Sequence, residues 1–465
     1  MIKKLLLSFL ITISFIAFSQ KDTSIVTILH INDLHAKINR FPQLKHVLDS
    51  IRKDKEDVYL FSAGDLFSGN PIVDKYEKRG WPMIDLMNDL AFDLSAFGNH
   101  EFDYGQEVLN ERIKDANFDF ICANINTDEA VLNQPKAYKI FTTKSGIEIA
   151  VVSVLQIGEN GLPDSHPKYF TDLKFEDPEK VLKSYKKELK KYDFKIALTH
   201  LGAKKDRVVA ENNQWLDLII GGHSHTRMEP LEQYKNVRVT QAGGNVKYLG
   251  VNTVMFVDKK IISIENHLIP LKFQERDSVI QAKVKAFSKN PELQKQIATI
   301  TYKIETPEEI GQLMADAYRE GLGADIAFQN IGGVRSKYIL EGPMKLIDVM
   351  YLDPFNNEIM LFELNKKEIL SFLNYSFSVR HKRNQLISGI DAQFITNKKG
   401  ELTDLILKDK EGKEILDDKL YKVAINSYMA SSYRFLGKEK AQFTGLSSND
   451  LLIKYFAKYF PITTK

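Results

Sequence analysis

The sequence is poor in cysteine, which excludes one class of protein at once. Only 1 of its 465 residues is a cysteine. A lone cysteine cannot form a disulfide within the chain, so a disulfide-stapled scaffold is excluded. Cys122 lies in the apolar run FDFICANI, with no base beside it in the sequence. We therefore expect a buried, inert thiol and not a cysteine nucleophile.

An excess of charge of either sign is missing as well. The chain has 64 Lys and Arg residues against 61 Asp and Glu residues, which gives a formal net charge of +3. Such a balance offers no electrostatic basis for binding nucleic acid or a membrane surface. We expect the partner to be a small molecule and not a nucleic acid, and we expect the protein to be a monomer.

Long hydrophobic runs are absent outside the N-terminus. There, Leu5–Phe18 follows two lysines and leads to small residues, which is the pattern of a secretory signal peptide with cleavage near Ser19–Gln20. The run is shorter than the roughly 20 residues of a membrane span. No cysteine lies near the cut to accept a lipid. We expect residues 1–19 to be removed and the protein to be periplasmic or secreted, without a stable membrane anchor; an uncleaved anchor is the alternative.

The sequence does contain a regular alternation of strand and helix patterns. Runs rich in β-branched residues, such as SIVTILHI, alternate with segments of helical periodicity, such as FPQLKHVLDSIRKD. This alternation predicts an α/β fold in which helices cover sheets, and the length suggests two domains. We expect one domain over residues 20–270, a charged linker helix region over 271–304, and a second α/β domain over 305–465.

Polar residues follow five apolar strands of the first half. In order, the motifs are NDLH (Asp33, His35), GD (Asp65), GNHEFD (Asn99, His100, Asp103), THLG (His200) and GGHSH (His223, His225). Ligands of open α/β sheets collect at the carboxyl ends of strands, so these motifs are expected to share one crevice. One intervening residue, as in DLH and HSH, puts two side chains on the same side of an extended backbone. Carboxylate, imidazole and amide groups together suit divalent metals such as Zn, Mn or Fe.

The remaining histidines lack this pattern. His30 lies within the first strand, and we expect it to be packed in the core. His46, His166, His267 and His381 have no ligand partners nearby in the sequence, and we expect surface or structural roles for them.

The ordered set of motifs resembles the calcineurin-like metallophosphoesterase family. HINDLHAKI, GNHEFDYG and GGHSHT are most similar to its exported 5′-nucleotidase branch, which includes bacterial UDP-sugar hydrolases and 2′,3′-cyclic phosphodiesterases. FQNIGGVRS and YLDPFNN extend the resemblance into the second half of the chain. The resemblance implies an α/β (α+β) architecture: a four-layer α/β/β/α catalytic domain joined by the linker helix to a smaller α/β 5′-nucleotidase C-terminal domain that binds substrate.

The resemblance also implies a centre with two divalent metal ions, Zn, Mn or similar. The ligands implied for the first ion are Asp33, His35 and His225, those for the second are Asn99, His200 and His223, and Asp65 is implied as the bridge. His100 would be the catalytic group that stabilises the transferred phosphoryl group. Asp103 would accept a hydrogen bond from the His100 ring and fix its orientation.

The same resemblance suggests how the second domain binds substrate. Asn330 and Arg335 in NIGGVR would be polar contacts, Phe355 in DPFNN would be one ring that stacks on a base, and Tyr428 in NSYMASSYRF would be the second. Ordinary packing is the alternative for both rings. The chain departs from the family pattern in two places. The Gly-Gly-Asp-Gly turn is replaced near Ser432, Tyr433 and Arg434, and Thr306 lies where a basic residue is common.

We therefore predict an exported dinuclear-metal phosphohydrolase, with 5′-nucleotidase activity on nucleoside monophosphates as the first expectation. Within the same class the alternatives are a 2′,3′-cyclic-nucleotide phosphodiesterase/3′-nucleotidase and a UDP-sugar hydrolase. From another class, the alternative is a non-catalytic nucleotide- or surface-binding protein.

Overall fold

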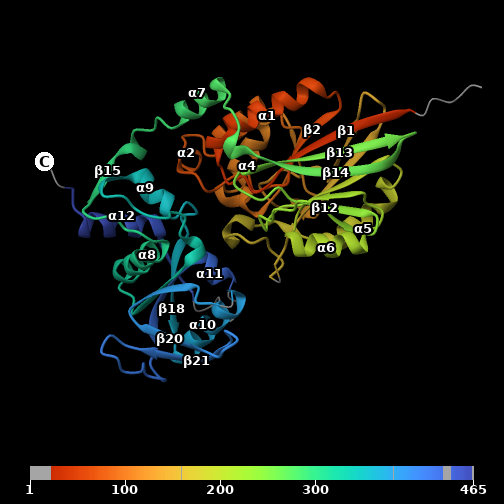
Figure 1. Ribbon diagram of the computed structural model, residues 1–465. Coiled ribbons are helices and arrows are strands. Elements are labelled where there is room, and N and C mark those ends of the chain that lie inside the picture. Colours follow the sequence, from red (N-terminus) through yellow and green to blue (C-terminus); the bar gives the residue numbers. More distant parts are fainter. Residues whose placement is uncertain (1–21, 159, 381, 433–440, 463–465) are drawn as a thin grey trace, which may run out of the picture.

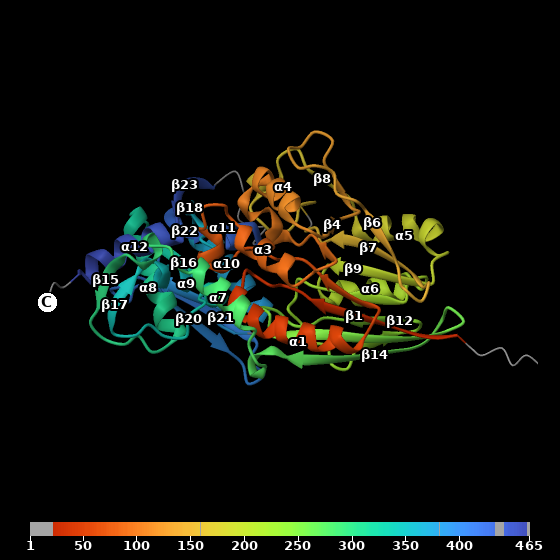
Figure 2. The ribbon, with the colours of Figure 1, turned by 90° about the horizontal axis from the view of Figure 1, so that it is seen from above.

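The computed structural model describes residues 22–158, 160–380, 382–432 and 441–462. The predicted signal peptide, residues 1–19, lies outside the described residues, as do His381, Tyr433 and Arg434. Within the described residues, no helix combines the length and apolar character needed to cross a bilayer. The chain folds into an N-terminal and a C-terminal domain, which lie side by side in both ribbon views (Figure 1 and Figure 2).

The N-terminal domain contains two six-stranded sheets. The first has the order β14-β13-β1-β2-β3-β4, with β1 Thr23–Ile31, β2 Val58–Ser62, β3 Leu94–Ala96, β4 Asp119–Ile121, β13 Tyr248–Val257 and β14 Lys260–Pro270. The second has the order β11-β12-β10-β9-β7-β6, with β6 Tyr138–Thr142, β7 Glu148–Leu155, β9 Phe194–His200, β10 Leu218–Ile220, β11 Glu232–Tyr234 and β12 Val237–Thr240. A short pair, β5 (Ile125–Asn126) and β8 (Lys174–Phe175), lies apart from both sheets. The central strands β1 to β4 run parallel, as do β7, β9, β10 and β12.

The two sheets pack face to face, and helices cover their outer faces. Val26 and Ile28 of β1 share one buried apolar cluster with Ile149 and Val151 of β7. The outer face of the first sheet is covered by α1 (Phe41–Asp54), α3 (Trp81–Asp89) and α4 (Gln106–Asp115), and that of the second by α5 (Pro178–Leu189) and α6 (Ala203–Asn212). This confirms the predicted four layers, and it explains why the strands read as nearly continuous apolar runs, since both of their faces are buried.

Local signals in the sequence start the helices as expected. The carboxylate of Asp177 accepts the backbone N–H of Lys180 at 2.9 Å, and Pro178 occupies the first helical position of α5. Cys122 is buried in the core beside β4, and burial raises the pKa of its thiol to about 12. The thiol is therefore protonated at neutral pH, which confirms the expectation of an inert side chain.

The segment between the domains is helical over only part of the predicted linker. Helix α7 covers Ser278–Phe287, and it lies where the two domains meet in both ribbon views (Figure 1 and Figure 2). Residues Gln296–Ile300 instead form strand β15, which pairs with β17 (Gly342–Lys345) of the C-terminal domain. Ala298 and Ile300 are buried and alternate with more exposed residues, which is the period of a strand and not of a helix.

The C-terminal domain is built on a five-stranded sheet with the order β19-β16-β22-β18-β23. Its strands are β16 Ile326–Asn330, β18 Glu358–Leu364, β19 Gln385–Ser388, β22 Tyr421–Asn426 and β23 Gln442–Ser447. One face packs on α8 (Pro307–Leu322), α9 (Leu346–Leu352) and α12 (Ser448–Tyr459). The other face packs on α10 (Lys366–Arg380), α11 (Ser427–Ser432) and the hairpin of β20 (Asp391–Thr396) and β21 (Leu402–Lys408). The layered α/β character predicted for this domain is confirmed.

A cavity of about 720 Å³ lies between the two domains. It is lined from one side by the loops that follow the central strands of the N-terminal domain, and by helix α2 (Pro71–Asp74). From the other side it is lined by residues after β16, around the start of β18 and on α11. The fold thus brings the carboxyl ends of the N-terminal strands against a second domain.

Candidate active site

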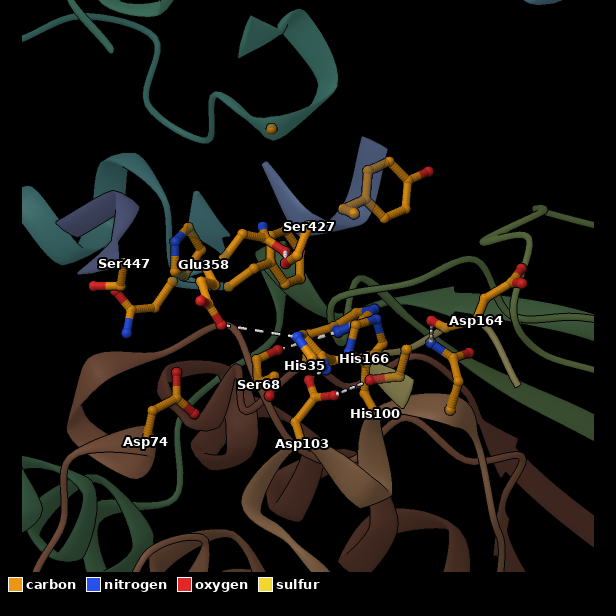
Figure 3. Close-up of a pocket in the computed structure, with 18 of the residues that line it drawn as sticks. His35, Ser68, Asp74, His100, Asp103, Asp164, His166, Glu358, Ser427 and Ser447 are labelled. Atoms are coloured by element: carbon orange, nitrogen blue, oxygen red, sulfur yellow. Dashed lines mark hydrogen bonds and ion pairs between the residues drawn. The ribbon is translucent and has the colours of Figure 1, made fainter. Parts of the chain in front are cut away.

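The polar loops predicted from the sequence meet at one end of the two sheets. The residues concerned are Asp33 and His35 after β1, Asp65 after β2, Asn99, His100 and Asp103 after β3, His200 at the end of β9, and His223 and His225 after β10. His35, His100 and Asp103 approach the cavity from the N-terminal domain, while Glu358 and Ser427 approach it from the C-terminal domain (Figure 3). The predicted convergence of these loops is therefore present.

One cluster contains Asp33, His35 and His225, whose ligand atoms all lie within 4.8 Å of one another. The Nε2 atoms of His35 and His225 are 3.0 Å apart. Nε2 of His225 also lies 3.3 Å from Oδ1 of Asp33. These are the three residues that the family resemblance implies for one ion.

A second cluster contains Asp65, His200 and His223. Oδ2 of Asp65 lies 3.2 Å from Nε2 of His200 and 3.8 Å from Nε2 of His35, so this one oxygen faces both clusters. Nδ1 of His223 lies 3.0 Å from Oδ1 of Asn99, which adds the amide oxygen to the second cluster. Asp65 thus occupies the position expected of a shared ligand.

Hydrogen bonds at Nδ1 of His200 and of His35 select the tautomer in which Nε2 can bind a cation. Nδ1 of His200 lies 2.7 Å from the carbonyl oxygen of Ala63, and Nδ1 of His35 lies 3.2 Å from that of Ser68. A carbonyl oxygen only accepts, so each Nδ1 carries the hydrogen and each neutral ring directs an Nε2 lone pair into the site. Nε2 of His200 is buried and has no hydrogen-bond partner among the described residues. Inward-facing lone pairs and a shared carboxylate fit divalent cations.

The electrostatics of the site also favour a cation. Burial alone would raise the pKa of Asp65 and lower that of His200. Their attraction outweighs burial, so the pKa of Asp65 lies well below its usual range and that of His200 rises to about 10. Burial likewise opposes charge on Asp33, but His225 and His200 hold its pKa below the usual value. The buried carboxylates of Asp33 and Asp65 therefore favour a positive charge beside them, either a proton on His200 or a metal cation at its Nε2.

The backbone around these ligands is strained. Asp33, His35, Asp65, His223 and His225 all have positive φ angles, of 51°, 46°, 56°, 76° and 51°. Residues with a side chain rarely adopt this left-handed conformation, and each such residue costs on the order of 1 kcal/mol or more. Such strain is typical of functional sites, where the surrounding structure holds the backbone in place. Five of the predicted ligands share this conformation, which residues outside the site, such as Ala91 and Lys259, also adopt.

Glycine is required where the loops approach most closely. A Cβ atom on Gly98 would lie 2.2 Å from Oδ1 of Asp65 and 2.8 Å from Cε1 of His200. One on Gly222 would lie 2.6 Å from the carbonyl oxygen of Ala63 and 2.8 Å from Nδ1 of His200. Only glycine lets the loops after β3 and β10 pack directly against the ligands.

His100 stands beside the two clusters and is held by Asp103. Nδ1 of His100 lies 2.7 Å from Oδ2 of Asp103, and its backbone N–H donates to Oδ1 of Asp65 at 2.9 Å. Both residues lie in the 3₁₀ helix η2 (Asn99–Tyr104), where a residue and the third one after it lie on the same face. Burial lowers the pKa of His100, but the carboxylates of Asp103 and Asp65 outweigh this effect and raise it to about 9. One of its ring nitrogens is also near enough to ligand atoms of His35 and Asp65 to form a further cluster of potential ligands.

The sequence analysis missed Glu101, which holds the loop that carries Asp65. Glu101 is fully buried, and its two oxygens accept the backbone N–H groups of Asp65 at 3.0 Å and Leu66 at 2.7 Å, as well as that of Gly98. Burial and the neighbouring Asp65 raise the pKa of Glu101 to about 7. Its position in GNHEFD does not indicate this role, because the loop that it holds lies 35 to 36 residues away in the sequence.

His166 was expected to be a surface or structural residue, and the structure places it at the wall of the cavity. Its ring lines the cavity, and Nε2 lies 3.9 Å from Oε2 of Glu358 in the C-terminal domain. The sequence could not indicate this role, because the partner is almost two hundred residues away. His30, in contrast, is fully buried as expected.

All four predicted substrate residues, Asn330, Arg335, Phe355 and Tyr428, line the cavity. The ring of Phe355 stacks on that of His100, with centroids 5.7 Å apart and planes at 29°. The guanidinium of Arg335 lies over the Phe355 ring, 4.7 Å from its centroid. Asn330 accepts a hydrogen bond from Nδ2 of Asn426 at 3.0 Å. The altered turn after Tyr428 lies largely outside the described residues.

Thr306, at the position where a basic residue was expected, has a local role instead. Its hydroxyl accepts the backbone N–H of Glu309 at 3.2 Å and caps α8. The side chain therefore stabilises the start of the helix.

Two family models match the chain. The model described as calcineurin-like phosphoesterase matches residues 26–227, and the model described as 5′-nucleotidase, C-terminal domain, matches residues 284–435. The first match contains every cluster residue of the candidate site, and the second contains the four predicted substrate residues, Asn330, Arg335, Phe355 and Tyr428.

Known proteins resemble the chain over nearly its whole length. A 5′-nucleotidase of Vibrio vulnificus is 26% identical, with 94% of this chain and 91% of the relative covered. Protein UshA of Escherichia coli is 25% identical, with 96% and 93% covered. The crystal structure of a 5′-nucleotidase precursor from Thermus thermophilus has a TM-score of 0.77 at 22% identity, and the match covers 95% of this chain and 98% of that one. This last likeness shows that the fold is shared.

Proposed function

Since the chain belongs to the calcineurin-like phosphoesterases with a 5′-nucleotidase C-terminal domain, and is thus a metal-dependent phosphoric ester hydrolase, we propose that it is an exported 5′-nucleotidase with two divalent ions. The observation that carries this proposal is the stacking of Phe355 on His100. It joins a candidate base-binding ring to the candidate catalytic histidine within one cavity. The membership of the family favours an enzyme over a non-catalytic binding protein.

In this proposal Asp33, His35 and His225 hold one ion, Asn99, His200 and His223 hold the other, and Asp65 is shared by both. When bound, such a pair of cations supplies Lewis-acid stabilisation of phosphoryl oxygens and lowers the pKa of water in the site. The mixed nitrogen and oxygen ligands suit Zn²⁺, Mn²⁺ and similar ions.

His100 stabilises the transferred phosphoryl group by a hydrogen bond or protonates the leaving oxygen. Its Nδ1–H donates to Asp103, so the other ring nitrogen, Nε2, faces the cavity. The neighbouring carboxylates favour the protonated ring, as the raised pKa of His100 indicates. In this form Nε2–H donates a hydrogen bond to a phosphoryl oxygen or gives its proton to the leaving oxygen of the nucleoside. Asp103 keeps the ring in this orientation.

The C-terminal domain selects the nucleotide. Phe355 and Tyr428 offer aromatic faces to the base, and a stacked base gains about 1–3 kcal/mol. Arg335 and Asn330 offer a cation and an amide to the sugar or phosphate. In the described arrangement the Phe355 ring already has His100 and Arg335 against it. A base that stacks there displaces one of them, so we propose that the second domain moves when substrate enters.

The proposed export rests on the N-terminal sequence. Residues 1–19 have the charge and apolar pattern of a cleaved signal peptide. The mature enzyme would then meet its substrate in the periplasm or outside the cell.

A phosphate-release panel with the metal-loaded protein tests the proposed function. The substrates are nucleoside monophosphates, UDP-sugars, 2′,3′-cyclic nucleotides and ribose 5-phosphate, and the variants are His100→Ala and, as a remote control on α1, His46→Ala. We expect nucleoside monophosphates to be hydrolysed fastest, with the activity lost in His100→Ala and kept in His46→Ala. A preference for ribose 5-phosphate would overturn the nucleotidase proposal, and a preference for cyclic nucleotides or UDP-sugars would replace its substrate.

A further inference from the structure

Three consecutive residues, Asp164, Ser165 and His166, contact three different parts of the candidate site. They lie in the connection from β7 to α5, and all three line the cavity. None of them belongs to the predicted ligands or to the His100–Asp103 pair. Asp164 and His166 are seen at the cavity wall in Figure 3.

Asp164 contacts two of the proposed ligands of the second ion. Its Oδ2 lies 3.5 Å from Nε2 of His223, the nitrogen opposite the one that faces Asn99. Its backbone carbonyl accepts a hydrogen bond from Nδ2 of Asn99 at 3.0 Å. Because only the amide nitrogen can donate to a carbonyl oxygen, this bond fixes which end of the Asn99 amide is the nitrogen. The amide oxygen Oδ1 is then directed at the cluster of Asp65, His200 and His223. Asp164 thus orients both an imidazole and an amide ligand from outside.

Ser165 contacts the other half of the site. Its hydroxyl donates to Oδ1 of Asp103 at 2.8 Å, while Oδ2 of Asp103 holds Nδ1 of His100. The carboxylate of Asp103 is therefore held from both sides. Its orientation, and with it that of the His100 ring, depends on the position of Ser165.

His166 connects this segment to the C-terminal domain. Nδ1 of His166 accepts the backbone N–H of Lys168 at 3.2 Å, so in the neutral ring Nε2 carries the hydrogen and faces Glu358, 3.9 Å away. Oε1 of Glu358 accepts the backbone N–H of Gly445 at 2.9 Å, and the His166 ring packs against Phe443 with centroids 5.9 Å apart. Only 14% of the His166 side chain and 17% of the Glu358 side chain are exposed, so solvent barely reaches this contact.

We propose that residues 164–166 are a positioning segment that ties the placement of the C-terminal domain to the second metal site and to His100. The inference rests on the proposed function and deepens it. The segment contacts no reacting atom. When the C-terminal domain rests on His166, the segment is held, Asp164 fixes His223 and Asn99, and Ser165 fixes Asp103. When the domain moves away, the same residues lose their support.

Metal affinity tests the role of Asp164 without any substrate. The apo-protein is titrated with Zn²⁺ against a fluorescent chelator, for the wild type, Asp164→Asn, Asp164→Ala and the control Asp172→Asn, an exposed aspartate of the same connection. We expect the second ion to bind about 10–100-fold more weakly in Asp164→Ala, with a smaller loss in Asp164→Asn. Affinities equal to those of the Asp172→Asn control would overturn the proposal.

The role of Ser165 is read from a split between kcat and KM. Ser165→Ala removes the hydroxyl that holds Asp103, while Ser165→Thr keeps a hydroxyl. We expect Ser165→Ala to lower kcat about 3–10-fold with little change in KM, a small part of the roughly 100–10,000-fold that a positioned acid contributes, and Ser165→Thr to restore much of it. An unchanged kcat, or an equal loss in both variants, would remove Ser165 from the positioning segment.

The link between the domains has its own test. Glu358 contacts none of the proposed ligands. We nevertheless expect Glu358→Ala to lower the affinity of the second site for Zn²⁺ about 3-fold or more. Replacing residues that hydrogen-bond to metal ligands lowers metal affinity in the same way. The control Glu363→Ala changes an exposed residue on the same strand and is expected to have no effect. Equal affinity in the two variants would overturn the link.

These readouts separate the proposals: a protein that binds metal as described but hydrolyses no nucleotide contradicts only the proposed function.

Discussion

The ring of Phe355, from the C-terminal domain, stacks on the ring of His100, from the N-terminal domain, with 5.7 Å between the centroids. The contact joins residues that are more than two hundred positions apart in the sequence. It means that the ring proposed to recognise a base and the ring proposed to assist hydrolysis share one cavity.

Removing the Phe355 ring is expected to affect nucleotides and not phosphate esters in general. Loss of about 1–3 kcal/mol of base stacking raises KM for nucleoside monophosphates about 5–150-fold in Phe355→Ala. Hydrolysis of ribose 5-phosphate, which has no base, changes little. Steady-state kinetics on both substrates checks this, with Phe273→Ala as the control, since Phe273 is 79% exposed near the start of α7. An equal loss on both substrates would show that Phe355 acts on the chemistry and not on the base.

His100 and Asp103 are expected to matter for turnover and not for metal content. His100→Ala removes the proposed proton donor and lowers kcat by about 100-fold or more. Asp103→Asn keeps the size of the side chain but weakens the hold on the ring, so it gives a smaller loss. Elemental analysis of both variants is expected to find the metal content of the wild type. A loss of metal in His100→Ala would make this residue a ligand and not a catalytic group.

Glu101 is expected to be essential for the metal site although it is not among the clustered ligands. Glu101→Ala leaves the buried N–H groups of Asp65 and Leu66 without an acceptor, which destabilises the fold by about 2–4 kcal/mol. Because the same loop carries Asp65, metal binding weakens as well. Urea denaturation and metal titration measure the two effects, with the exposed Glu107→Ala as the control. A variant as stable as the control would contradict the role described for Glu101.

His30 is expected to make the protein sensitive to acid. Burial lowers the pKa of His30 to about 3, and neither ring nitrogen has a hydrogen-bond partner among the described residues. In the unfolded chain the pKa returns to about 6.5. The unfolded state therefore binds more protons below pH 6.5, and the free energy of unfolding falls as the pH decreases from there toward 3. Between neutral pH and pH 5, this residue alone lowers the free energy of unfolding by about 2 kcal/mol.

The measurement compares wild type with His30→Leu in chelator, by urea denaturation at pH 7.5 and pH 5. Chelator keeps metal ligands in the same state in both proteins. We expect the variant to lose about 2 kcal/mol less than the wild type between the two pH values. The same loss in both proteins would show that His30 is not the group that titrates.

The sequence predicted the fold and the residues of the site because both leave periodic or local signals. The apolar strands of the N-terminal domain are buried on both faces, and polar motifs such as NDLH and GGHSH stand where those strands end. The convergence of the loops follows from these two patterns, whereas the four layers were implied by the resemblance to the calcineurin-like phosphoesterases. The cap at Asp177 has an equally local cause, whereas the glycine at position 98 is required by the approach of Asp65 and His200 from other loops.

Other features depend on contacts across the fold and leave no such signal. The left-handed backbone at Asp33 and His223 is imposed by surrounding loops, since neither residue favours it alone. Glu101 is recognisable only once the loop of Asp65 lies above it, and His166 only once Glu358 lies beside it. The strand at Gln296–Ile300 lies in a charged, helix-forming segment, and its pairing with β17 overrides that local preference.

The central claim is that hydrolysis needs two divalent cations held by the loops of the N-terminal domain. The most direct measurement is a titration of the chelator-treated protein with Zn²⁺ or Mn²⁺, in which phosphate release from a nucleoside monophosphate is followed against equivalents of metal. We predict no release without metal and a rise that levels off at two equivalents per chain. Release in the absence of metal, or a plateau at one equivalent, would contradict the account.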